Sequence, residues 1–157
     1  MRTLETHATM PVEKKSSIRW KRVVLGAVFS ELAVFAVMFV VIAVYQFILA
    51  PGLTGAEYDE FGQNVAGYYF AAPAGAVGTF LFGIWAARAM RSSAVKAGVL
   101  VGMISAVLAL PFIFGAKPEH QLMYMISYAG RLVGGYCGGF VVQRMGGRLD
   151  DHTRQVH

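Results

Sequence analysis

Two charged side chains lie deep inside apolar stretches of the sequence, Glu31 and Arg131. An ionised group in hydrocarbon costs at least ~2.5–3.5 kcal/mol, so each should face the interior of a helix bundle and have a partner. The simplest prediction is that they pair. Such a pair either fixes the register of two helices or forms a coupling site, where Glu31 takes up a proton or cation and releases Arg131. If they do not pair, one of them contacts another subunit or a lipid headgroup.

A polar stripe accompanies Arg131 in the same apolar stretch. Its members fall at helical spacings that place them on one side of a helix: His120, Tyr124, Ser127 and Tyr128. The stripe could line a wet cavity that runs from the membrane surface to its middle. It could equally be hydrogen-bonded packing against Gln46, Tyr68 and Tyr69 from neighbouring helices, and the sequence does not decide between the two.

The elements that must position these residues are four long apolar stretches. Hydrophobic residues make up 56% of the chain and charged residues 15%, whereas soluble domains carry about 25% charged residues. The stretches are Val23 to Ala50, Val65 to Ala87, Ala97 to Ala116 and Leu122 to Val142. Each reaches the roughly 20 residues that a helix needs to cross a bilayer. Because lipid offers no partner for backbone polar groups, we expect helices, and the alternating pattern of a membrane β-barrel is absent.

The sequence therefore predicts an all-α polytopic membrane protein with four transmembrane helices in two antiparallel hairpins. We expect a mobile basic tail over 1–18, a four-helix transmembrane domain over 19–146, and a second tail over 147–157. The expected helices cover about 20–49, 64–89, 95–116 and 120–145. The first is too long for a cleaved signal and is read as retained.

Turn and proline signals mark the breaks between these helices. Pro51-Gly52 ends the first helix, and Gly146-Gly147 is expected to end the last. The intervening loop from Gly52 to Asn64 is acidic and aromatic and could hold a short surface helix. Pro73 and Pro111 interrupt the backbone hydrogen bonding of the second and third helices, which invites kinks.

Basic residues predict the orientation. Twelve lie before the first apolar stretch, between the second and third, or after the fourth, against one, Lys117, in the opposite loops. This asymmetry places both termini in the cytoplasm. Since we identify no organelle-targeting segment, we expect a multi-pass protein of the plasma (inner) membrane, with the lipid bilayer as its partner. The net charge of +5 does not indicate nucleic-acid binding, because the basic residues lack interleaved aromatic residues apart from Trp20, which is better explained as an anchor at the membrane interface.

Small residues recur at four-residue spacing on the predicted helices, and such stripes allow close approach of helices in lipid. The clearest stripe is Gly130, Gly134 and Gly138, with Gly98 and Gly102 on the third helix and Gly67 and Gly75 on the second. We expect these stripes to pack the helices of one chain together. A second stripe on the fourth helix, Gly135 and Gly139, could instead form the interface of a homo-oligomer.

No catalytic or metal-binding motif is present. The chain lacks HExxH, GxSxG, GxxxxGK[ST] and CxxC. Cys137 is the single cysteine, and His152 and His157 lack the spacing of a metal site. We therefore expect no enzyme, no metal and no cofactor.

The run from Leu25 to Leu32 resembles the first helix of small multidrug resistance transporters, four-helix proteins with a proton-coupled glutamate there. The likeness covers eight residues. This chain departs from that family by its long basic tails, Arg131 in the fourth helix, a long outer loop and its strong orientation bias. Only the interest in Glu31 follows from the likeness.

Two functions are therefore considered. The first is a non-enzymatic membrane component, free-standing or an accessory subunit of a larger membrane complex. The alternative is a small oligomeric ion- or proton-coupled transporter or channel that uses Glu31 and Arg131. A pore would need more than one copy, because four helices enclose little space.

Overall fold

The computed structural model describes residues 18–114, 118 and 121–154, and for Tyr68, Phe112, Ile113 and residues 147–154 the backbone alone. The described residues form helices joined by short turns, with no strand among them. In chain order the elements are α1 (Trp20–Val44), the π-helix η1 (Tyr45–Leu49), α2 (Gly55–Phe61), the π-helix η2 (Gly62–Phe70), α3 (Ala71–Ala87), the 3-10 helix η3 (Arg91–Ser93), α4 (Ala94–Phe114) and α5 (Gln121–Arg154). The all-α prediction is thus confirmed for this part of the chain.

Two of the described helices are long and apolar enough to cross a membrane, Trp20–Leu49 and Arg91–Pro111. A third candidate span is the pair Gly55–Gly67 and Ala71–Ala87, which is bent by 50°. The helix α5 does not reach the same hydropathy, because it contains Arg131 and repeated glycines. Two or three candidate spans indicate a membrane protein, and the fourth span stays a prediction.

The surface of the bundle carries large apolar side chains, as expected for contact with lipid. Phe39, Phe47 and Phe114 are 75%, 74% and 87% exposed. A soluble monomer seldom exposes apolar patches on this scale, so the exposure agrees with the hydropathy of the spans.

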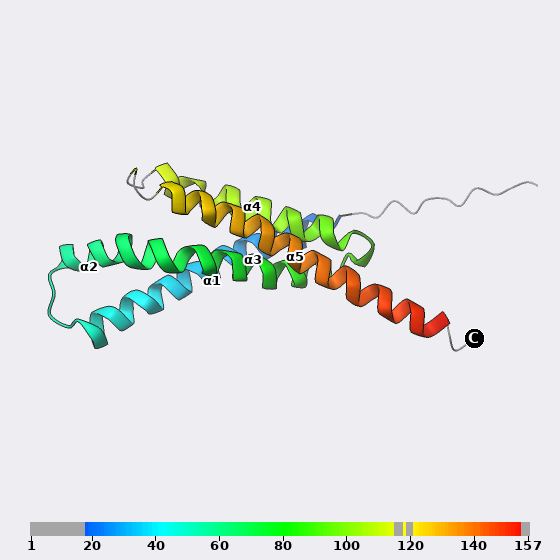
Figure 1. Cartoon of the computed structure of the whole chain (residues 1–157), viewed down its shortest axis with the longest axis horizontal. Coiled ribbons are helices and arrows are strands. Elements are labelled where there is room, and N and C mark those ends of the chain that lie inside the picture. Colours follow the sequence, from blue (N-terminus) through cyan, green and yellow to red (C-terminus); the bar gives the residue numbers. More distant parts are fainter. Residues whose placement is uncertain (1–17, 115–117, 119–120, 155–157) are drawn as a thin grey trace, which may run out of the picture.

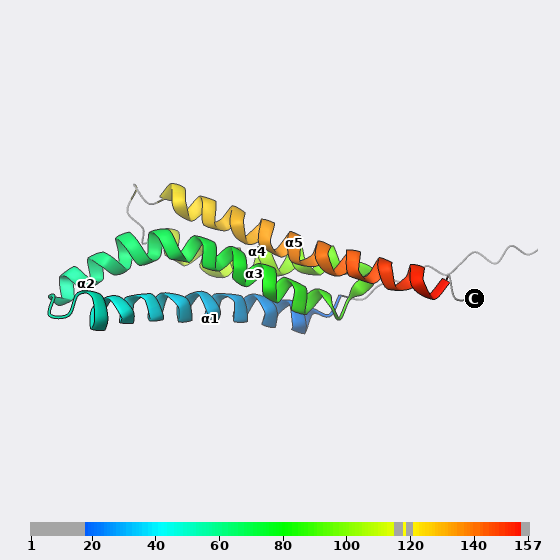
Figure 2. The ribbon, with the colours of Figure 1, turned by 60° about the horizontal axis from the view of Figure 1, so that its bottom comes forward.

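The helices α3 and α4 form the middle of the bundle. Each packs against α1 and against α5, and they also pack against each other. Extensive packing between α1 and α5 is not found among the described residues. Figure 2 shows why: α1 and α5 lie on opposite sides of α3 and α4.

Close packing is concentrated at one end of the bundle, opposite α2 (Figure 1). A cluster of mostly Ala and Val side chains is buried there: Val23, Ala27, Ala86, Ala87, Met90, Ala94, Ala97, Val101 and Val142. Such small side chains let the helix backbones approach closely, which drives helix association in lipid.

Glycines make the tightest of these contacts, and they do so within the chain. A Cβ on Gly135 would lie 3.1 Å from the Cα of Gly102, and one on Gly139 would lie 2.8 Å from the Cα of Val95. The second stripe of α5 is therefore already covered by α4, so the alternative of a homo-oligomer seam on it is not supported.

The first stripe packs against α3. A Cβ on Gly138 would lie 3.0 Å from the nitrogen of Ile84, and one on Gly134 would meet Ala76 and Thr79. The contacts of Gly130 are looser, since its Cβ would lie 3.4 Å from that of Ala76. Gly98 packs against Gly135 and Gly139, whereas a Cβ on Gly67 would lie 3.2 Å from the oxygen of Gly62 in its own helical segment.

The expected loop from Gly52 to Asn64 is mostly helical. Thr54 caps α2, its backbone N–H donating to Glu57 Oε2 at 2.8 Å and its hydroxyl to the same oxygen at 2.8 Å. The pair Thr54 and Glu57 has the spacing of a capping box, so this helix start was readable from the sequence.

The predictions from the glycine pair near the C-terminus and from the two prolines can be compared with the helices. The expected end of the last helix at Gly146-Gly147 is wrong, because α5 continues to Arg154. A glycine inside a helix costs about 1 kcal/mol relative to alanine, which weakens a helix without stopping it. The 50° bend that precedes α3 lies where Pro73 was expected to invite a kink, and Pro111 lies within α4, which continues to Phe114.

We predict that Gly135→Ala lowers the free energy of unfolding by about 1–3 kcal/mol, because its Cβ would meet backbone atoms that cannot retreat. Thermal unfolding in detergent would measure this. Gly146→Ala is the matched control, since a Cβ there meets nothing within 4 Å. It should raise stability by up to about 1 kcal/mol through helix propensity. Equal effects of the two substitutions would contradict the packing described.

Candidate functional site

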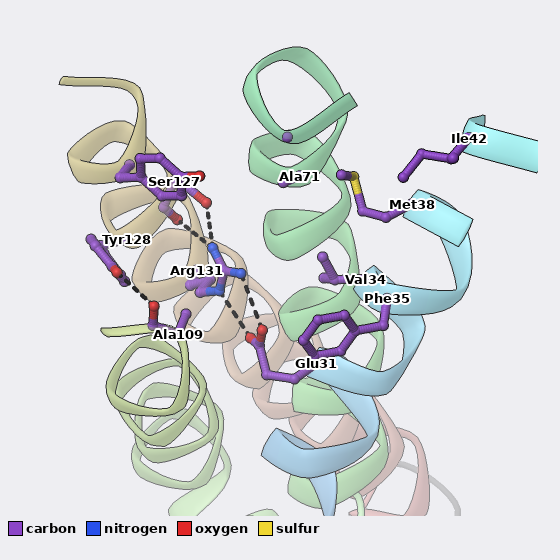
Figure 3. Close-up of a pocket in the computed structure, with 12 residues that line it drawn as sticks. Glu31, Val34, Phe35, Met38, Ile42, Ala71, Ala109, Ser127, Tyr128 and Arg131 are labelled. Carbon is purple, nitrogen blue, oxygen red and sulfur yellow. Dashed lines mark hydrogen bonds and ion pairs between the residues drawn. The ribbon is translucent and has the colours of Figure 1, made fainter. Parts of the chain in front are cut away.

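Glu31 of α1 and Arg131 of α5 form an ion pair inside the bundle. Arg131 donates from Nε to Glu31 Oε1 at 2.9 Å and from Nη2 to Oε2 at 3.2 Å. The two residues are 8% and 4% exposed. Two parallel bonds between a guanidinium and a carboxylate are the strongest and most directional form of such a contact. Figure 3 shows both bonds.

Two serines complete the hydrogen bonding of the pair. The Ser105 hydroxyl of α4 donates to Glu31 Oε1. Arg131 Nη1 donates to the Ser127 hydroxyl, one turn earlier on α5. A buried pair is tolerated when its remaining polar atoms are satisfied, so Ser105 and Ser127 belong to the site. Ser105 was not singled out from the sequence, although it is a hydroxyl in the middle of an apolar stretch.

Gly75 of α3 makes room for the guanidinium. A Cβ at this position would lie 2.8 Å from Arg131 Cζ and 2.8 Å from Nη1. The sequence placed Gly75 in a stripe for packing between helices, whereas the structure places the Arg131 side chain against it. The long side chain of Arg131 can cross in front of α3 because Gly75 has no side chain.

The pair joins two helices that otherwise have little contact. Since α1 and α5 each pack on α3 and α4 rather than on one another, Glu31 and Arg131 meet across the centre of the bundle. With Ser105 on α4 and Gly75 on α3, all four helices contribute to the contact.

A cavity of about 270 Å³ lies on the α2 side of the pair. Its lining includes Glu31 and Arg131 together with Val34, Phe35, Met38, Ile42, Gly67, Ala71, Ala109, Tyr124, Ser127 and Tyr128. The close-packed Ala and Val cluster lies on the other side of the pair. The ion pair is therefore the floor of the cavity, and apolar side chains form much of its wall (Figure 3).

Three members of the predicted polar stripe line this cavity, and the fourth, His120, lies outside the described residues. Tyr128 also donates from its hydroxyl to the backbone oxygen of Ala109 at 2.8 Å. Tyr124, Ser127 and Tyr128 thus border a hollow space, and Ser127 and Tyr128 hydrogen-bond to Arg131 and Ala109, which are not the predicted partners.

A second hollow meets Glu31 from the outside of the bundle. It is a groove of about 330 Å³ between α1 and α4, lined by Val28, Glu31, Leu32, Phe35, Leu108 and Pro111. Glu31 and Phe35 line the cavity and the groove alike. The carboxylate is therefore close to the surface expected to face lipid as well as to the interior.

No family model, no curated protein and no solved structure matches this chain. What the site can do must therefore follow from its chemistry. Among the described residues, no three His, Cys, Asp or Glu side chains gather as metal ligands. The arrangement holds a buried charge pair beside a largely apolar cavity.

We predict that Ser105→Ala lowers the free energy of unfolding by about 1.5–3 kcal/mol, the usual worth of a hydrogen bond to a charged group. Ser93→Ala is the matched control, because the Ser93 hydroxyl is also buried but makes no hydrogen bond within the described residues. Removing that unbonded hydroxyl should leave stability unchanged or slightly higher. Thermal unfolding of both variants would check this, and an unaffected Ser105→Ala would contradict the role given to Ser105.

Proposed function

We propose that this protein is a non-enzymatic component of the plasma (inner) membrane that crosses the bilayer four times with both termini in the cytoplasm. The observation that carries the proposal is the bidentate ion pair between Glu31 and Arg131 inside an apolar bundle. Its placement supports a role in holding helices together, and it offers no reaction class.

The pair acts as a brace between α1 and α5. Those helices have little other contact, so their relative position depends on α3, α4 and this one bridge. Removing either partner would leave a buried charge without compensation, which typically costs about 3–5 kcal/mol. This cost belongs to the unpaired charge, so it disfavours arrangements of α1 and α5 in which the two side chains do not meet.

The proposed orientation follows from the positive-inside rule. With the termini in the cytoplasm, the close-packed end of the bundle faces the cytoplasm and the cavity lies toward the outer face. As an accessory subunit, the chain would present its exposed aromatic side chains, such as Phe39 and Phe47, to lipid, to a second copy or to a larger membrane complex.

A second candidate function is a small oligomeric proton- or ion-coupled transporter or channel. The cavity that ends on Glu31 and Arg131 favours it, because a charged residue in contact with a cavity at membrane depth marks many ion and proton pathways. In this function Glu31 would titrate, and Arg131 would control its charge state.

The two functions separate in a double-mutant cycle of Glu31→Gln, Arg131→Gln and the double variant. For a brace, each single change lowers the free energy of unfolding by about 3–5 kcal/mol, and the double variant is more stable than the sum of the single effects predicts. Thermal unfolding in detergent measures the cycle, with proton movement in proteoliposomes recorded alongside.

The opposite pattern would reject the brace. Single variants as stable as wild type, which lose a proton signal that wild type gives, would make Glu31 a coupling residue. The control is Glu60→Gln, which removes an exposed carboxylate of α2 and should alter neither stability nor proton movement.

The orientation is tested by cysteine labelling in a Cys137→Ser background. We predict that a membrane-impermeant maleimide labels Asp59→Cys on intact cells, whereas Ser92→Cys reacts only after the membrane is opened. Both positions are exposed, so a difference in labelling reports the side of the membrane. Labelling of Ser92→Cys from outside would contradict the proposed topology.

A further inference from the structure

We infer that the cavity is a binding site for an amphipathic organic acid, whose carboxylate replaces Glu31 on Arg131 while Glu31 takes up one proton. The inference goes beyond the proposed brace by assigning a class of ligand to the cavity. It rests on the shape of the cavity, the charge balance of its floor and the groove beside Glu31.

The lining of the cavity has an apolar part and a charged part, as an amphipathic molecule does. Val34, Met38, Ile42 and Ala71 form apolar walls, whereas the ion pair lies at the floor. Small-molecule sites are typically apolar spaces with a few convergent polar groups that fix orientation. A ligand with a hydrocarbon body and one polar end would place that end on Arg131.

The guanidinium selects a carboxylate as the polar end. A planar fork of N–H donors binds carboxylates in two parallel bonds, which is how Arg131 now holds Glu31. Ser127 and Gly75 fix the position of this fork, so a ligand carboxylate would find the donors already oriented. A neutral alcohol of the same length could not make both bonds.

Charge balance couples this binding to a proton. Glu31 and Arg131 are neutral as a pair, and an added carboxylate would give the floor a net negative charge in a medium that penalises it. One proton on Glu31 restores neutrality: the ligand carboxylate pairs with Arg131, and the Glu31 carboxyl becomes an uncharged hydrogen-bonding group. The site then has the same net charge before and after binding.

Few other groups could supply or hold that proton. The titratable side chains that face Glu31 are Arg131, Tyr124 and Tyr128, all on α5. The helix α3 contains no charged residue, and the one charged residue of α4, Lys96, is exposed and lies nine positions before Ser105. Protonation within the site therefore falls on Glu31.

The groove between α1 and α4 gives the ligand a route from the lipid. Leu32 and Phe35 are 54% and 51% exposed there, and Leu108 is 43% exposed. Phe35 and Glu31 border both the groove and the cavity, so the two hollows adjoin at these side chains. An amphipathic acid dissolved in the membrane reaches Glu31 without crossing water.

Octanoate is a suitable probe, with 1-octanol as the neutral control. Calorimetric titration into protein in nanodiscs, with empty nanodiscs subtracted, should show saturable binding of octanoate and none of octanol. Binding should consume about one proton. At pH values where the carboxyl groups of free octanoate and of unliganded Glu31 are both ionised, the affinity should therefore fall about tenfold for each unit by which the pH rises. Saturable octanol binding as tight as that of octanoate, or no saturable octanoate binding, would overturn the inference.

The variant Glu31→Gln shows whether the proton is taken up by Glu31 or by octanoate. Glutamine imitates protonated Glu31, so this variant should bind octanoate without proton uptake and with no dependence on pH. If it still takes up a proton with octanoate, the acid enters in its neutral form and the exchange on Arg131 is wrong. Arg131→Gln should lose binding, and retained binding would overturn the assignment of Arg131.

A cavity-filling variant keeps the test independent of the brace. Ala71→Leu places extra volume in the cavity without touching the ion pair, and it should abolish octanoate binding while the thermal stability stays near that of wild type. Ala36→Leu makes the same change at an exposed position of α1 and should bind normally. Loss of the coupling energy in the double-mutant cycle would reject the brace alone, and undiminished binding by Ala71→Leu would reject the binding site alone.

Discussion

A carboxylate and a guanidinium can remain inside an apolar bundle only while each compensates the other, and the rest of this structure is arranged around that constraint. Glu31 and Arg131 bond in parallel, Ser105 and Ser127 bond to them from α4 and α5, and Gly75 leaves the space that the guanidinium occupies. Because an unpaired buried charge is so costly, these contributions from four helices limit how those helices can be rotated about their axes.

The pair also divides the bundle into two halves of different character. On one side, Ala and Val side chains and glycine contacts bring the helices close together. On the other side, larger residues and two tyrosines surround a cavity of about 270 Å³. Van der Waals packing supplies most of the association of helices in lipid, so the close-packed half contributes more to the stability of the fold than the half that contains the cavity.

A brace and a binding site are compatible uses of the same two residues. A static pair contributes stability as long as no other group competes for Arg131, and an anion competes only if Glu31 can become neutral at the same time. The lateral groove beside Glu31 is the route that we propose for such a competitor, an amphipathic acid dissolved in the lipid. The same requirement for neutrality thus explains why Glu31 and Arg131 pair in the bundle and why the proposed binding of an anion needs a proton on Glu31.

The sequence by itself determined the helical class and singled out Glu31 and Arg131, because hydropathy and the cost of a buried charge are local properties of residues. The spans of four helices and the orientation remain predictions that rest on apolar length and basic residues. Even local signals were partly missed, since the Thr54 and Glu57 spacing marks the start of α2 and the glycines at 146 and 147 do not stop α5. Only the tertiary structure decided that Gly75 receives a guanidinium, that Ser105 joins the pair and that the hollow lies on one side of it. Those features depend on how helices far apart in the chain are rotated and tilted against one another, which the packing of the whole bundle sets.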